Sequence, residues 1–195
     1  MTTGSKRTWN SAGSVNRSAQ QEMELQIEKT AALYFAFNTS VSSDFYQKEL
    51  ILRSLLPNRG KNTVIEAPFY TDFGYNCLIG DETFISPNVY LMDLSQIRIG
   101  KRCYIGPNSN IYTALVTGTS CPDTEAVYSA HPDGINGNSH PTGAVTIGEN
   151  VWIGSNVTIY PGITIGKNCV IKDNSVVREN IPDNVVAAGS PCRVV

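Results

Sequence analysis

Aliphatic residues recur at a fixed interval of six along the C-terminal part of the chain. The series is Ile147, Ile153, Ile159, Ile165, Ile171 and Val177. Three residues after successive members stand Asn150, Asn156, Gly162, Asn168 and Asn174. Asparagine and glycine tolerate the left-handed backbone conformation that a tight corner requires. A step of six fits neither a helix nor a hairpin. It predicts a coil with three short strands per turn and the aliphatic side chains in a common core.

The same rhythm occurs earlier in the chain and is then interrupted. One run contains Ile79, Ile85 and Leu91, and a second contains Ile99, Ile105 and Ile111. The second run is in phase with the C-terminal series, whereas the offset between the two runs indicates about two inserted residues near Asp93 and Leu94. Between Ile111 and Ile147 the rhythm fails, so we expect a long loop there. A loop of this length is uncommon unless it has a function.

Helical periodicity is confined to the N-terminal region. Four apolar residues share one helical face, which are Met23, Ile27, Ala31 and Tyr34. The segment Asn38–Ser40 ends this first predicted helix. Ser43-Asp44 is typical of a helix N-cap, so a second helix is expected to begin there and to stop before Pro57.

These patterns divide the chain into three predicted parts. Residues 1–17 are expected to form a mobile tail rich in Ser, Thr, Asn and Gly, and residues 18–60 a two-helix cap. Residues 61–195 are expected to form a parallel β-helix with a loop excursion at about 113–143. The predicted fold class is therefore mainly β.

Composition and charge exclude several kinds of protein. Hydrophobic residues make up 41% of the 195 residues and charged ones only 16%, a combination that argues against a disordered chain. A net charge of −2 offers no basic field to a phosphate backbone, so we expect no nucleic-acid partner. The longest apolar run, Thr30–Phe37, is far shorter than the roughly 20 residues of a spanning helix, so we expect no membrane partner.

The cysteines and histidines give no sign of a disulfide framework or a metal site. The five cysteines, Cys77, Cys103, Cys121, Cys169 and Cys192, are an odd number, widely spaced and without a C-x-x-C pair. This usage fits reduced thiols in a cytoplasmic protein. The two histidines, His131 and His140, lack a ligand cluster, so no sequence feature requires a metal.

Three motifs point to a family. Pro68–Asn76 reads PFYTDFGYN, Val151–Gly154 reads VWIG, and Gly189–Val194 reads GSPCRV. Together with the two helices and the six-residue repeats, they resemble the maltose/galactoside O-acetyltransferases among the hexapeptide-repeat acyltransferases, over about residues 20–195. The resemblance implies a left-handed parallel β-helix, which is an exception to the usual right-handed crossover. It also implies a homotrimer, with acetyl-CoA in a groove between neighbouring coils.

The resemblance further implies a histidine at the base of a loop that takes the proton from the acceptor hydroxyl. Ile111–Ala114 matches the family, but a gap-free reading puts Val116 at the histidine position, and a small shift puts Thr119 there. Three alternatives follow. His131 is carried back to the site by an insertion, His140 takes this role, or the histidine base is absent.

Other candidate positions come from the same resemblance. The family's supporting asparagine falls on Ser86, a second asparagine matches Asn88, and Asp93 matches an aspartate after the second repeat run. The family's N-terminal aspartate has no convincing match. Trp152, Gly154, Ser155 and Arg193 fall at positions that contact CoA in the family, with Arg178 nearby. Tyr112, Asn88 and His140 are candidates for binding the substrate.

Three functions are compatible with these residues. The first is a CoA-dependent O-acetyltransferase that acts on a hydroxyl of a small molecule, with His131 as the base and Asp93 and Ser86 as further catalytic residues. The second is an enzyme that keeps the groove between subunits but catalyses an isomerisation, dehydration or cyclisation. The third is a binding protein without catalytic activity.

Overall fold

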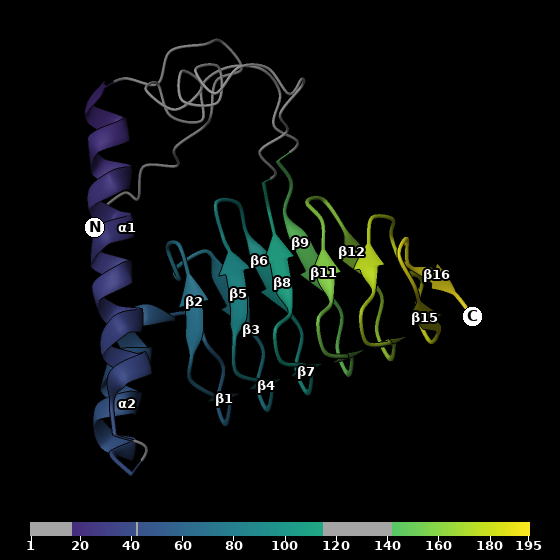
Figure 1. Ribbon diagram of the computed structural model, residues 1–195, viewed down its shortest axis with the longest axis horizontal. Coiled ribbons are helices and arrows are strands. Elements are labelled where there is room, and N and C mark those ends of the chain that lie inside the picture. Colours follow the sequence, from purple (N-terminus) through teal and green to yellow (C-terminus); the bar gives the residue numbers. More distant parts are fainter. Residues whose placement is uncertain (1–16, 42, 115–141) are drawn as a thin grey trace, which may run out of the picture.

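Short strands from successive turns of the chain lie in register above one another (Figure 1). This computed structural model describes residues 17–41, 43–114 and 142–195. Trp152 pairs with Val170, eighteen residues later, whereas Phe84 pairs with Tyr104, twenty residues later. These intervals correspond to one turn of the predicted coil. The prediction of a mainly β fold with stacked parallel strands and two N-terminal helices is confirmed.

Three sheets run along the β-helix, one on each side of the coil. Sheet 1 contains β1 (Val64–Ile65), β4 (Phe84–Ile85), β7 (Tyr104–Ile105), β10 (Trp152–Ile153), β13 (Val170–Ile171), β15 (Val186–Ala188) and β16 (Arg193–Val194). Sheet 2 contains β2 (Phe69–Thr71), β5 (Val89–Met92), β8 (Asn110–Tyr112), β11 (Thr158–Ile159) and β14 (Val176–Val177). Sheet 3 contains β3 (Cys77–Ile79), β6 (Ile97–Ile99), β9 (Val145–Ile147) and β12 (Thr164–Ile165). The strands β15 and β16 pair antiparallel, whereas the other neighbouring strands pair parallel.

The core consists of stacked aliphatic side chains behind each sheet. Ile85, Ile105, Ile153 and Ile171 stack behind sheet 1, Leu91, Ile111, Ile159 and Val177 behind sheet 2, and Ile79, Ile99, Ile147 and Ile165 behind sheet 3. All of them are buried. Each fully buried side chain of this kind contributes about 1.5–3 kcal/mol. The interval of six therefore repeats a stabilising contact, as the sequence predicts.

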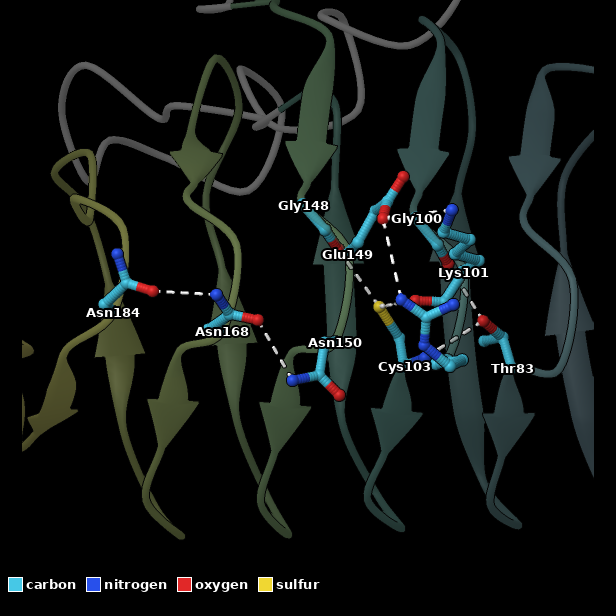
Figure 2. Close-up of polar contacts among 10 residues, drawn as sticks. Thr83, Gly100, Lys101, Cys103, Gly148, Glu149, Asn150, Asn168 and Asn184 are labelled. Carbon is cyan, nitrogen blue, oxygen red and sulfur yellow. Dashed lines mark hydrogen bonds and ion pairs between the residues drawn. The ribbon is translucent and has the colours of Figure 1, made fainter.

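The corners between strands adopt the predicted left-handed conformation. The φ angles are 57° at Asn150, 54° at Asn156, 78° at Gly162, 56° at Asn168 and 59° at Asn174. Side chains at one such corner also join successive turns (Figure 2). Asn150 Nδ2 donates to Asn168 Oδ1 at 3.0 Å, and Asn168 Nδ2 donates to Asn184 Oδ1 at 2.7 Å. These asparagines thus satisfy both the backbone conformation and a side-chain hydrogen-bond ladder.

Two cysteines donate hydrogen bonds inside the coil instead of forming disulfides. Cys103 Sγ lies 3.1 Å from the carbonyl oxygen of Gly148 (Figure 2), and Cys169 Sγ lies 2.9 Å from that of Pro182. Burial raises the pKa of Cys103, which keeps its thiol protonated and able to donate. Among the described residues the cysteines are free and buried, and Cys121 lies outside that part of the chain.

Two helices cover the N-terminal end of the coil (Figure 1). They are α1 (Arg17–Thr39) and α2 (Phe45–Leu55), so Arg17 belongs to the first helix and not to the predicted tail. Asp44 caps α2 as expected, because its carboxylate accepts a hydrogen bond from Gln47 N at 3.1 Å. The apolar face expected from the spacing is only partly buried in α1: Ile27 is 38% exposed, whereas Phe37, which is not one of the four residues of that face, is buried.

Asn38 joins the first helix to sheet 2. Its Oδ1 accepts from Phe69 N at 2.8 Å, and its Nδ2 donates to Phe69 O at 3.0 Å. The side-chain amide thereby supplies both hydrogen bonds that a neighbouring strand would make with this residue of β2. The helix therefore caps the free edge of sheet 2 at Phe69.

The corner between sheets 2 and 3 is longer than the other corners in the early turns. Eight residues separate Thr71 from Ile79 and Leu91 from Ile99, where the regular interval is six. The predicted insertion near Asp93 and Leu94 is confirmed, and the preceding turn has an equal one. The segment predicted to be a long loop follows this same corner one turn later, after β8, and its residues 115–141 lie outside the described residues. We call this corner the long corner.

A buried carboxylate organises the long corner. Asp93 Oδ1 accepts hydrogen bonds from Thr71 Oγ1 at 2.8 Å, Asp72 N at 3.1 Å and Phe73 N at 2.8 Å. Its Oδ2 accepts from Asn76 N at 3.2 Å. Ionised carboxylates accept only, and such charge-assisted hydrogen bonds are among the strong ones. Asp93 thus fixes the backbone of residues 71–76, at the same corner of the preceding turn.

The described residues on either side of segment 115–141 are bound to the same corner or to each other. Thr113 Oγ1 donates to Met92 O at 2.6 Å and accepts from Ser95 N at 2.9 Å. Ala114 and Thr142, which flank this segment, form an antiparallel bridge. The described chain on both sides of the segment is therefore tied together by hydrogen bonds.

We expect Asn168→Ala to destabilise the protein more than Asn168→Gly. Alanine at a left-handed corner costs roughly 1–2 kcal/mol of backbone strain. Glycine avoids that strain and loses only the ladder hydrogen bonds. Urea unfolding of the full chain, followed by circular dichroism at one protein concentration, measures the free energy of unfolding of both variants. A larger loss for the glycine variant would contradict this account.

We expect Asp93→Asn to lower the free energy of unfolding by roughly 1–3 kcal/mol, because one buried N–H loses its acceptor. Asp81→Asn is the matched control. Within the described residues, the Asp81 carboxylate accepts one hydrogen bond, from Lys61 N at 2.7 Å on an exposed corner, and an asparagine oxygen preserves that bond. Chemical denaturation of the two variants compares them. Equal stability of both variants would show that the carboxylate is not needed at the long corner.

Candidate functional site

Polar aromatic side chains line the outer side of sheet 2 beside the long corner. We call Asp72, Tyr90, Tyr112, Tyr160 and Arg178 the tyrosine strip. The rings of Tyr90 and Tyr112 meet edge to face with centroids 6.1 Å apart. At the other end, Arg178 Nη2 donates to the Tyr160 hydroxyl at 2.9 Å, and its guanidinium carbon lies 4.6 Å from the ring centroid. The pairing of β5, β8, β11 and β14 places these residues on successive turns.

The strip begins with a hydrogen-bonded pair of titratable groups. Tyr90 Oη donates to Asp72 Oδ1 at 2.7 Å. Burial raises the pKa of the Asp72 carboxyl, the Tyr90 hydrogen bond opposes this shift, and the negative charge of Asp93 adds to it. Burial, together with the neighbouring Asp72 carboxylate, raises the pKa of Tyr90 far above its usual range. The hydroxyl of Tyr90 therefore remains a proton donor to the carboxylate.

Sheet 1 carries a stack of flat aromatic rings on its outer side. The rings of Phe84 and Tyr104 lie 5.7 Å apart with planes 14° apart, and those of Tyr104 and Trp152 lie 4.0 Å apart with planes 21° apart. Trp152 ends the stack and is 52% exposed. Because the Trp152 indole is exposed and stacks on Tyr104, it offers a ligand a rigid apolar surface.

Three of the residues predicted to bind CoA lie close together at the end of this stack. A cavity of about 460 Å³ is lined by Trp152, Val170, Ile171, Lys172 and Asp173. Asp173 Oδ1 accepts from Ser155 N at 2.7 Å. A Cβ on Gly154 would collide with the same carboxylate, so only glycine fits there. Trp152, Gly154 and Ser155 therefore surround one region of the surface.

Arg193, the fourth predicted CoA residue, lies farther along the same sheet. It is in β16, two strands beyond β13 in sheet 1. Its Nη2 forms a 2.7 Å ion pair with Glu179 Oε1, and both side chains are largely exposed. Such an exposed ion pair contributes little free energy, so the Arg193 guanidinium can exchange Glu179 for another anion.

Two predicted catalytic residues lie inside the coil and not on its outer surface. Ser86 is 3% exposed, and its main-chain N donates to Ile105 O at 2.9 Å. Asp93 is fully buried, with its carboxylate occupied by four donors. Both geometries favour a positioning role over direct contact with a substrate. Asn88, a predicted substrate residue, is a corner residue with φ of 59°.

Tyr112 is the predicted substrate residue that lies in the tyrosine strip. Burial raises the pKa of its phenol, with a further contribution from Tyr160. The predicted histidines, His131 and His140, lie outside the described residues.

The sequence analysis did not single out Asp72 or Tyr90 as site residues. The sequence nevertheless contained a signal for Asp72. The early turns repeat every twenty residues, and this interval aligns Asp72 with Met92 and with Tyr112, a predicted substrate residue.

Within residues 17–41, 43–114 and 142–195, no group of three His, Cys, Asp or Glu side chains is arranged to hold a metal ion. None of the described helices is long and apolar enough to cross a membrane.

Comparisons with known proteins agree with this architecture. Residues 144–179 match the family model described as bacterial transferase hexapeptide (six repeats). Galactoside O-acetyltransferase of Escherichia coli (strain K12) is 37% identical over 163 residues, which are 84% of this chain and 74% of that protein.

Two solved structures have closely similar folds. A galactoside acetyltransferase in complex with coenzyme A is 32% identical with a TM-score of 0.78, covering 90% of this chain and 82% of that one. A hexapeptide-repeat acetyltransferase from Vibrio cholerae O1 biovar eltor, complexed with acetyl coenzyme A, is 30% identical with a TM-score of 0.78, covering 94% and 92%. The left-handed parallel β-helix implied by the resemblance is thus confirmed. The chain belongs to the hexapeptide-repeat acetyltransferases, alongside the galactoside and maltose O-acetyltransferases.

Proposed function

We propose that this protein is a CoA-dependent O-acetyltransferase that acts on a hydroxyl of a small molecule. One observation carries the proposal: the chain shares its fold with relatives solved in complex with coenzyme A or acetyl coenzyme A, at 30–32% identity and a TM-score of 0.78, over 90–94% of its length. The exposed end of the aromatic stack, with a cavity beside it, supports a binding role for this surface.

The residues beside Trp152 fit the chemical parts of the cofactor. The indole and the cavity offer apolar surface to the pantetheine arm. At the corner of Gly154 and Ser155 both N–H groups are already bonded, to Ile171 O and Asp173 Oδ1, so the second lone pairs of the two carbonyl oxygens are the main-chain groups left for the ligand. Arg193, in the same sheet, is a candidate for the phosphates. Bound acetyl-CoA would supply an acetyl thioester as the acyl donor.

The proposed reaction needs a proton acceptor near the acceptor hydroxyl. The hydroxyl oxygen attacks the thioester carbonyl, its proton passes to the base, and CoA leaves as a thiolate that takes up a proton. We assign the base to His131, because neutral imidazole is a suitable acceptor near pH 7. His140 is the alternative base. If His131 is the base, we assign His140 to substrate binding. Asp93 and Ser86 would act by fixing corners, and Asn88 and Tyr112 by lining the substrate site.

The assembly and the compartment are part of the proposal. We propose a cytoplasmic homotrimer with the groove between neighbouring subunits. This follows from the family resemblance and from reduced cysteines used as hydrogen-bond donors. The expectation that nucleic acid is not a partner follows from the net charge of −2.

We expect the full-length protein to release free CoA thiol when it is mixed with acetyl-CoA and an acceptor such as maltose or a methyl galactoside. His131→Ala should lower kcat on the order of 10²–10⁴-fold, because general base catalysis typically contributes that much. His140→Ala is the comparison and should change kcat much less.

The results separate the three candidate functions. If the native reaction persists in the double variant His131→Ala/His140→Ala, a histidine base is excluded. CoA binding without acetyl transfer would favour a different reaction in the same groove. Absence of CoA binding in a thermal-shift assay would contradict the acetyltransferase proposal, and absence of any small-molecule binding would favour a non-catalytic protein.

We expect Trp152→Ala to raise the KM for acetyl-CoA on the order of tenfold, since a lost contact worth about 1.4 kcal/mol corresponds to that factor. Tyr46→Ala is a control, because Tyr46 is an exposed aromatic residue of α2, at the N-terminal end of the coil. Steady-state kinetics with acetyl-CoA as the varied substrate measures the effect. An unchanged KM in the Trp152 variant would remove this residue from the proposed CoA site.

A further inference from the structure

Charged residues follow one corner of the coil, between sheets 3 and 1, and the sign of their charge alternates from turn to turn. We call them the charged column, and in chain order they are Lys61, Asp81, Lys101, Glu149, Lys167 and Asp183. The residue after each member has a left-handed conformation, and from Asp81 onwards that residue donates a main-chain hydrogen bond to the carbonyl oxygen of the member one turn earlier. The alternation therefore places unlike charges on neighbouring turns.

Side chains of the charged column form ion pairs between turns. Lys101 Nζ lies 3.4 Å from Glu149 Oε2 (Figure 2), and Lys167 Nζ lies 4.0 Å from Asp183 Oδ2. Such exposed pairs contribute little free energy one by one. Their regular order nevertheless shows that each cation of the column has an anion within reach on an adjacent turn.

Lys61 stands at the N-terminal end of the charged column. Its main-chain N donates to Asp81 Oδ1 at 2.7 Å, but among the described residues its ammonium group forms no ion pair. The alternation predicts an anion one step before Lys61. At that end of the coil the chain forms the helix α2 in place of an earlier turn (Figure 1).

A cavity of about 660 Å³ lies between α2 and the first corner, and we call it the N-terminal cavity. Its charged lining residues are three cations, Arg53, Arg59 and Lys61, and one carboxylate, Glu49. The lining thus has an excess of two positive charges. The N-terminal cavity has no lining residue in common with the cavity beside Trp152.

Glu49 shows how these cations hold an anion. Its carboxylate accepts from Arg59 Nη2 at 2.9 Å and 2.8 Å, and from Arg53 Nε at 3.1 Å. Burial raises the pKa of Glu49, but the hydrogen bonds of Arg53 and Arg59 outweigh this effect and lower it. Glu49 is therefore an ionised carboxylate at neutral pH.

The three cations differ in how far they are already bound. The Arg59 side chain is only 11% exposed, and its Nη1 also donates to Thr63 O at 3.4 Å. In contrast, within the described part of the chain the Nη groups of Arg53 and the ammonium of Lys61 have no hydrogen-bond acceptor. Arg53 and Lys61 therefore offer free donors at the same cavity.

Charge and size define the ligand that fits this cavity. A phosphate monoester carries about −1.5 to −2 charges at pH 7, which matches the excess of the lining, and guanidinium and ammonium groups are its usual protein partners. The cavity is much larger than a phosphate group, and Leu56 and Pro57 add apolar atoms to its wall. An organic group attached to the phosphate would occupy that space.

We propose that the N-terminal cavity binds a small organic phosphate, whose phosphate group contacts Arg53 and Lys61 and takes the position of the missing anion of the charged column. Arg59 and Glu49 are positioning residues in this assignment, because their ion pair holds Arg53 at the cavity. The proposal does not depend on acetyl transfer, since the cavity beside Trp152 is a different one.

Arg53→Gln and Lys61→Gln test the site with exposed side chains that the fold does not bury. Glucose 6-phosphate is the probe, titrated calorimetrically into the full chain without acetyl-CoA, in a phosphate-free buffer of low ionic strength. We expect the Kd to rise on the order of tenfold in each variant, as for the loss of a hydrogen bond to a charged group. Arg98→Gln is the matched control, because Arg98 is an exposed cation of β6 in sheet 3. Its Kd should stay within about twofold of wild type.

Glu49→Gln gives a result of the opposite sign. Glutamine keeps an oxygen for the two arginines but removes the charge that competes with the ligand. We expect the Kd for glucose 6-phosphate to fall roughly threefold to tenfold, because the lining gains one positive charge. A purely structural role of Glu49 predicts weaker or unchanged binding. Thermal unfolding of each variant without ligand shows that it is folded.

Inorganic phosphate and Arg193→Gln locate the ligand and identify its source. Free phosphate should bind more weakly than glucose 6-phosphate, and Arg193→Gln should leave the affinity unchanged. Weaker binding in Arg53→Gln and Lys61→Gln, with normal binding in Arg98→Gln and Arg193→Gln, supports the site even if no acetyl transfer is found. Four results overturn the proposal: no binding of glucose 6-phosphate by the wild type at millimolar concentration, equal affinity for inorganic phosphate, unchanged affinity in Arg53→Gln and Lys61→Gln, or an equal loss in Arg98→Gln or Arg193→Gln.

Discussion

The stacking of each turn on the next is the constraint on which the other features depend. Main-chain N–H groups of one turn bond to carbonyl oxygens of the following turn, as Gly106 N does to Ile153 O and Gly154 N does to Ile171 O, each at 2.8 Å. Because this ladder fixes the register, equivalent positions of successive turns lie above one another. Aliphatic, asparagine and aromatic side chains each form columns for the same reason. A polar group that enters the coil must find its partner in an adjacent turn, as Cys103 and Asp93 do.

The sequence predicts the repeat well because the repeat is a local property. The interval of six, the left-handed corners at the asparagines and the insertion near Asp93 follow from spacing and from the conformational freedom of Asn and Gly. For α1 the spacing predicted an apolar face but not which of its residues are buried. A helix that packs on the end of a coil presents a face determined by its crossing geometry, so Thr30 and Phe37 became buried while Ile27 did not. Helical periodicity alone does not contain that information.

The site was predicted only in part, because the candidate residues came from the family resemblance and not from the alternation along each strand. In a regular turn the position within the repeat tells whether a side chain points inward or outward. This alternation continues into the long corner, where Asp93 is buried two residues after the buried Leu91 and Asp72, next to the buried Thr71, is only partly buried. Ser86 departs from it, because it directly follows the buried Ile85 and is buried as well. In contrast, Trp152 occupies a regular strand position, and its outward direction follows from the alternation along β10.

The two ends of the coil have a consequence for assembly. A repeating fold offers, at each terminal turn, a row of unpaired N–H and C=O groups to which a further strand can add. Here the amide of Asn38 bonds to both main-chain groups of Phe69, and β16 turns back to pair antiparallel with β15. The chain thus carries its own substitutes for a neighbouring strand at both ends. At these two edges, the addition of a foreign strand is therefore opposed from within one molecule.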